Sequence, residues 1–102
     1  MTQTLRTYWR PRQGRHVLDI PWDRIQSRAV VVVTVAEWAR GEGVIVEGDQ
    51  PRWVGDANIW IAGIAPRDGG VRVAVNIDWH EPLPFVTDVT ILAEGADSIV
   101  YE

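Results

Sequence analysis

The sequence predicts an all-β fold, a small antiparallel β-sandwich of six to seven strands. Apolar and polar residues alternate along most apolar segments, and turn-forming glycine, proline and aspartate residues recur every eight to twelve positions. No segment of ten residues shows the 3.6-residue period of an amphipathic helix. Short strands separated by turns at such intervals are typical of sandwiches and small barrels. A chain of 102 residues is also long enough to bury about 65% of its unfolded surface as one domain.

The strongest pattern lies in residues 69–93, which predict a β-hairpin. Residues 71–78 alternate strictly, with three valines and Ile77 on one face and mostly polar residues on the other. This period of two indicates a strand that is buried on one side only. Pro82 and Pro84 then interrupt the ladder, because each lacks a backbone donor, and a second alternating strand begins at Phe85. Trp79 and His80 therefore fall at the tip of the hairpin.

The other elements follow from shorter signals. Residues 5–9 predict a short strand that is broken at Pro11, and residues 23–27 a helical turn or an irregular crossing. Residues 29–38 are so rich in valine that we expect a central strand covered on both faces. Further strands are expected over residues 15–22, 44–46, 53–64 and 98–101.

Charge is unevenly distributed and divides the chain into two regions. The first fifteen residues contain four arginines and no acid, whereas the other 87 contain six arginines and fourteen acids. We therefore expect a basic N-terminal arm, residues 1–14, before a single β-sandwich domain, residues 15–102. Such an arm could bind nucleic acid, pack against an acidic neighbouring chain or stay solvated. Nucleic acid is disfavoured as a partner, since the acidic body repels phosphate.

Composition argues against several other classes of protein. Without cysteine the chain forms no disulfide and no thiolate metal site. Its longest uninterrupted apolar run, residues 29–33, is far shorter than the ~20 residues of a membrane span. Residues 1–6 lack the apolar segment of a signal peptide. We expect no membrane association, and a protein that is cytoplasmic or exported without a signal peptide.

No arrangement in the sequence predicts catalysis or a bound cofactor. Ser27 and Ser98, the only serines, do not lie in a nucleophile turn, and nothing pairs His16 or His80 with a nucleophile. Asp78 and His80 would share a strand face, but no third metal ligand is evident beside them. The two prolines that follow exclude the helix of a His-Glu-x-x-His zinc motif. The sequence therefore predicts neither an enzyme nor a metal-binding protein.

The six tryptophans are the most unusual feature of the composition. Most fall at strand ends or turns, where an indole can stack on a sugar face, a base or another chain. The alternative is that they close the open ends of a small sandwich. Trp79 is the strongest candidate for a binding residue, because it stands beside His80 in the hairpin loop.

The hairpin also carries a family pattern. A turn at residues 68–70 is followed by the alternating strand, by Trp79-His80 at its end and by a fixed spacing through Phe85 to residues 90–93. This pattern resembles the H-type lectin domain, a six-stranded antiparallel β-sandwich of about one hundred residues. Members of that family bind N-acetylgalactosamine and related sugars without calcium. The resemblance extends over residues 15–93.

The resemblance implies a sugar site at a boundary between protomers. The family holds its sugar with a Trp-His pair, a loop tyrosine, an acidic residue near the N-terminus and an arginine on a middle strand. Trp79 and His80 match the pair, and Phe85 at the tyrosine position keeps the ring without the hydroxyl. Residues 11–14, the expected place of the acid, contain no acidic residue. Residues 56–58, the expected place of the arginine, contain no arginine.

The resemblance therefore implies a calcium-independent carbohydrate-binding module that acts as a homotrimer or hexamer. Trp79, His80 and Phe85 would bind a sugar of the galactose or N-acetylgalactosamine type at the hairpin tip. No catalytic residue, metal or cofactor is expected. The alternative is a non-catalytic structural or interaction module without a sugar site, such as a trimeric decoration, fibre or adaptor protein. In that case the tryptophans would be interface anchors.

Overall fold

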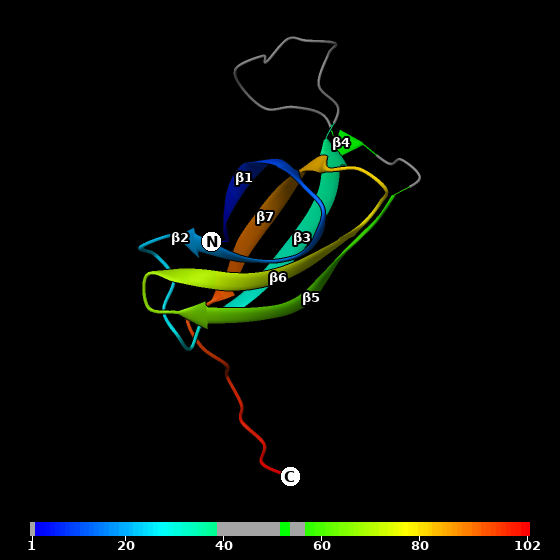
Figure 1. Cartoon of the computed structure of the whole chain (residues 1–102). Coiled ribbons are helices and arrows are strands. Elements are labelled where there is room, and N and C mark those ends of the chain that lie inside the picture. Colours follow the sequence, from blue (N-terminus) through cyan, green and yellow to red (C-terminus); the bar gives the residue numbers. More distant parts are fainter. Residues whose placement is uncertain (1, 39–51, 54–56) are drawn as a thin grey trace.

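The computed structural model describes residues 2–38, 52–53 and 57–102, and it confirms the predicted fold class. The described residues form a small antiparallel β-sandwich and contain no helix, and so none that is long and apolar enough to cross a membrane (Figure 1). The strands are β1 (Gln3–Arg12), β2 (Gly14–Pro21), β3 (Val30–Trp38), β4 (Arg52–Trp53), β5 (Asn58–Arg67), β6 (Gly70–Asp78) and β7 (Leu83–Ala93).

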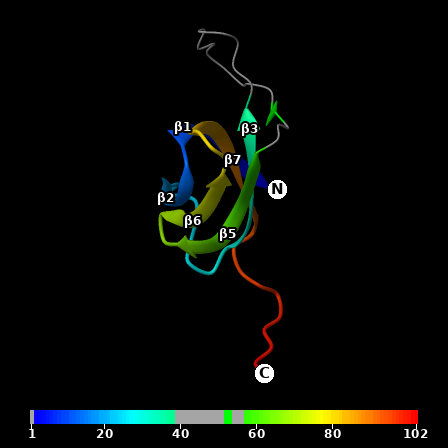
Figure 2. The same ribbon diagram turned by 45° about the vertical axis from the view of Figure 1, so that its right-hand side comes forward.

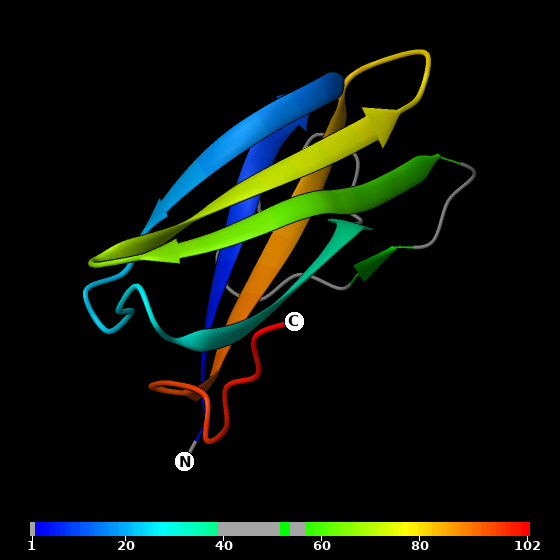
Figure 3. The same cartoon turned by 90° about the horizontal axis from the view of Figure 1, so that it is seen from below.

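The strands are divided between two sheets. One sheet has the order β1-β7-β3-β4 and the other the order β2-β6-β5. The chain therefore passes from one sheet to the other four times: between β1 and β2, between β2 and β3, between β4 and β5, and between β6 and β7. The β1–β2 and β6–β7 crossings lie at the same end of the sandwich (Figure 3). At the first crossing Gly14 has a φ of 78°, a conformation that favours glycine.

The core is built from the alternating positions of the facing sheets. Val71, Val73, Val75 and Ile77 of β6 are at most 1% exposed, as their period of two predicts. The same buried cluster includes Leu18 and Ile20 of β2, Ile25 of the loop after β2, Val33 of β3, and Phe85 and Val89 of β7. Burial of Ile25 was not predicted, because no periodic pattern surrounds it.

The predicted basic arm is an integral edge strand of the larger sheet. β1 pairs with β7 from residue 3 to residue 12. Arg6 donates to both carboxylate oxygens of Asp88 on β7, with N–O distances of 2.8 and 3.1 Å. This basic residue therefore finds its acidic partner within the chain, and residues 3–12 do not stand apart from the domain.

Pro11 does not end β1, contrary to the expectation. The pairing of β1 with β7 is irregular between Trp9 and Arg12, so Pro11 occupies a position without a regular ladder partner. A missing backbone donor costs little at such a bulge. The strand therefore continues past the proline, and it carries Arg12 to the end of the sandwich where the β1–β2 and β6–β7 crossings lie.

Other segments also differ from expectation. β3 covers the core with one face only, since Val30 and Val32 are 38% and 44% exposed. In a two-layered sandwich the outer face of each sheet meets solvent. Of the two alternatives for residues 23–27, the structure has the irregular crossing and not the helical turn. Residues 98–101 form no strand but extend away from the sandwich (Figure 2). The strand expected over residues 44–46 lies outside the described residues.

Candidate functional site

Trp79 and His80 lie together in the loop between β6 and β7, at the end of the sandwich that also holds the β1–β2 crossing. Their ring centroids are 4.4 Å apart and the ring planes are inclined by 44°. Trp79 is partly buried and His80 is exposed. The pair thus presents an aromatic surface and an imidazole side by side at the predicted hairpin tip.

The β1–β2 turn holds this loop in place. Gln13 Nε2 donates to the main-chain oxygen of Trp79 at 2.8 Å, across 66 residues of sequence. On its other side, His16 Nε2 is hydrogen-bonded to the main-chain oxygen of Gln13, also at 2.8 Å. A carbonyl oxygen only accepts, so His16 carries its proton on Nε2 in this contact. The tip is therefore built from two segments, residues 12–16 and residues 79–82.

Phe85 is not part of this exposed surface. Its relative exposure is 0%, and its ring stacks on Trp9 with centroids 6.0 Å apart and planes inclined by 13°. Trp9 Nε1 donates to Thr87 Oγ1 at 2.9 Å, which fixes the indole across the same strand pair. The predicted role of Phe85 in contacting a sugar does not agree with this position. Alternation along β7 turns Phe85 and Thr87 toward the core, and that signal outweighs closeness to the loop.

Arg12 is a residue of this end that the sequence did not single out. Its guanidinium carbon lies 5.7 Å from the centroid of the Trp9 ring. Its Nε atom is buried and has no hydrogen-bond partner within the part of the chain that the structure describes. A cation over an indole face is a favourable contact, but a buried donor without an acceptor is costly. The basic composition of residues 1–15 was the only sequence signal for Arg12.

The acidic residues near the loop do not assemble a metal site. Asp78 and Glu81 are both exposed. Within the described ranges, no three histidine, aspartate or glutamate side chains gather closely enough to hold a metal ion. The expected arginine at residues 56–58 is absent from the sequence, and residues 54–56 lie outside the description.

The other tryptophans have different surroundings. Trp9 and Trp22 are partly buried against the core. Trp38 contacts Tyr8 edge-to-face, with centroids 5.4 Å apart and planes at 74°. Trp60 is 44% exposed on β5, where it is paired with Asn76 of β6. Trp9, Trp22 and Trp38 therefore pack within the protein, as expected if tryptophans close the open ends of the sandwich.

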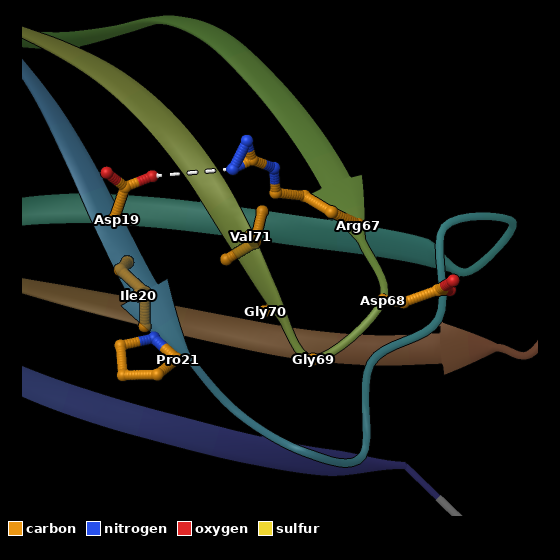
Figure 4. Close-up of a pocket in the computed structure, with 8 residues that line it drawn as sticks. All are labelled: Asp19, Ile20, Pro21, Arg67, Asp68, Gly69, Gly70 and Val71. Atoms are coloured by element: carbon orange, nitrogen blue, oxygen red, sulfur yellow. Dashed lines mark ion pairs between the residues drawn. The ribbon is translucent and has the colours of Figure 1, made fainter.

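A shallow hollow of ≈ 360 Å³ lies where β2 ends and β5 turns into β6 (Figure 4). Arg72 Nε donates to Asp19 Oδ1 at 2.9 Å, and Arg67 Nη1 lies 3.9 Å from the same oxygen. The hydrogen bond from Arg72, and then the charges of Arg72 and Arg67, lower the pKa of the Asp19 carboxyl. Asp68 accepts from the main-chain nitrogen of Ser27 at 2.9 Å and so fastens the loop after β2. These polar groups support the fold.

Comparison of the chain with protein-family models, with curated proteins and with solved structures found no match.

Proposed function

We propose that the chain is a carbohydrate-binding module, with its site at the tip formed by Trp79, His80 and Gln13. The observation that carries the proposal is the exposed His80 imidazole next to the partly buried Trp79 ring, on a loop that is tied to the neighbouring turn. An indole offers a flat apolar face to the C–H groups of a sugar ring. An imidazole both donates and accepts hydrogen bonds, as recognition of hydroxyl groups requires.

The role of Gln13 is to position the loop. Its amide nitrogen is engaged by the main-chain oxygen of Trp79, and its own main-chain oxygen by His16. Because these contacts are made within the chain itself, the sugar need not order the loop on binding. Recognition by a ring and hydrogen bonds has no need of calcium.

The proposal includes self-association as a trimer or hexamer. One open tip offers few contacts, so a single site is expected to bind weakly. Several identical tips on one symmetric assembly raise the overall affinity for a surface that bears many sugars, by about 10² or more. Light scattering measures this assembly directly.

The test is binding of galactose-type sugars to the His80→Ala variant, measured on a glycan array and by calorimetry. Loss of one hydrogen bond, worth about 0.5–1.5 kcal/mol, weakens binding by about 2- to 13-fold while the melting temperature is unchanged. Trp79→Ala should also weaken binding, and Trp60→Ala is its matched control, since Trp60 is an exposed indole on another strand. Equal binding by the wild type and His80→Ala would refute the proposed site.

A second candidate function, an interaction module without a sugar site, is favoured by a different observation. Val30 and Val32 on β3 and Leu92 on β7 are 38%, 44% and 50% exposed on neighbouring strands. Exposed apolar groups that lie together are typical of protein interfaces. Trimers that bind no glycan, and that dissociate in the Val32→Lys variant, would support this function over the first.

A further inference from the structure

The candidate site has a basic residue beside it, because the turn that holds the Trp79 loop through Gln13 begins at Arg12. We propose that the site takes an acidic sugar, one that carries a carboxylate or a sulfate, and that Arg12 binds this anionic group. The inference rests on the proposed function and specifies its substrate class.

The state of the Arg12 side chain supports this proposal. The guanidinium lies over the face of the Trp9 ring, which itself stacks on the fully buried Phe85. The Nε donor of Arg12 is buried and meets no acceptor among the described residues. An anionic oxygen is the strongest acceptor for such a donor, and a planar carboxylate or a sulfate suits the guanidinium fork.

Arg12 is also correctly placed along the chain. It directly precedes Gln13, whose amide is bonded to Trp79, and it is paired with Leu83, which ends the loop that holds Trp79 and His80. Arg12 therefore lies next to Gln13 along the chain and next to the end of the Trp79 loop across the strand pair. A sugar whose ring covers Trp79 could direct a charged substituent to this side of the loop.

The charged residues around Arg12 include arginines, which attract an anion, and acids, which repel it. Arg10 and Arg15 are exposed on either side of Arg12 along β1 and β2, whereas Asp78 and Glu81 are exposed at the two sides of the loop. Exposed charges are screened by solvent and salt. The partly buried Arg12 is screened less, so it dominates the preference for an anion.

The experiment compares three sugars that differ in one substituent: galactose, galacturonic acid and galactose-6-sulfate. Binding of each to the intact chain is measured by calorimetry and on arrays, for the wild type, Arg12→Gln and Arg15→Gln. We expect at least one acidic sugar to bind about tenfold more tightly than galactose to the wild type, with an affinity that falls as salt increases. Arg12→Gln removes the preference and keeps galactose binding, while Arg15→Gln, the matched control, retains the preference. Galacturonic acid and galactose-6-sulfate separate a carboxylate site from a sulfate site.

The outcomes distinguish the two proposals. If galactose binds as tightly as both acidic sugars, the charge inference is overturned and the carbohydrate site stands. If none of the three sugars binds, both proposals are overturned. Should Arg12→Gln fail to fold, because the guanidinium packs on Trp9, the wild-type comparison of neutral and acidic sugars still decides the question.

Discussion

Truncation of Phe85 tests whether this ring belongs to the core or to the site. In Phe85→Ala the ring is removed from a position with no exposed surface, stacked on Trp9. Loss of a fully buried phenylalanine costs about 3–5 kcal/mol, which includes the cavity that remains. A domain of this size has a total stability of about 5–15 kcal/mol, so the variant should lose between about a fifth and all of it. At about 4–8 °C per kcal/mol, the melting temperature should fall by more than 12 °C.

The assay is thermal and urea unfolding followed by far-ultraviolet circular dichroism. Val17→Ala is the matched control, since Val17 is an apolar residue that is 55% exposed on β2, and its melting temperature should change little. A fall of less than about 4 °C for Phe85→Ala, similar to the control, would show that the ring is not held between the sheets. Phe85→Tyr adds a second arm: a hydroxyl among apolar side chains costs about 1–3 kcal/mol if it finds no partner. Improved sugar binding by a fully stable Phe85→Tyr would refute the core assignment.

Two further predictions concern charge. Asp88→Ala should lower the free energy of unfolding by about 1.5–3 kcal/mol in urea, because it removes the acceptor of a two-bond, partly buried contact with Arg6. An unchanged urea midpoint would mean that β1 is held by its other contacts alone. The lowered pKa of Asp19 means that its stabilising effect is present above its ordinary value of 3.8 and is lost as pH falls through the lowered value. Wild type and Asp19→Asn should therefore differ in urea midpoint at pH 7 and converge in strong acid, and a difference that persists there would contradict the assignment.

The sequence predicted the structure best where apolar and polar side chains alternate along a strand. In residues 71–77 each second side chain is apolar, and those side chains are the ones the structure buries. The same rule applies to Phe85, which begins the alternating series that continues with Thr87 and Val89. The family pattern led to the prediction that Phe85 contacts a sugar, whereas the alternation places it on the face that the structure buries. Alternation is correct here because β7 is an inner strand, paired with β1 on one side and β3 on the other.

The features that were missed depend on partners far away in the sequence. Arg6 seemed to belong to an unpaired basic arm, but its acid is 82 residues away on β7. Nothing local identifies Asp88 as that acid among the fourteen in the chain. The contact of Gln13 with the Trp79 loop is of the same kind, since it requires the order of strands in both sheets. Such sites can be recognised only after the strands have been placed.

Strand β1 connects the fold to the candidate site. Among the residues that the structure describes, it is the edge strand of the larger sheet and has β7 as its one neighbour there. Its last residue, Arg12, is paired with Leu83, and the turn that follows holds the Trp79 loop. The tip therefore exists only while the end of β1 is docked on β7. A sugar that binds only the docked form must stabilise the pairing of β1 with β7 by mass action. A variant that weakens this pairing should therefore also lower the apparent affinity for the sugar.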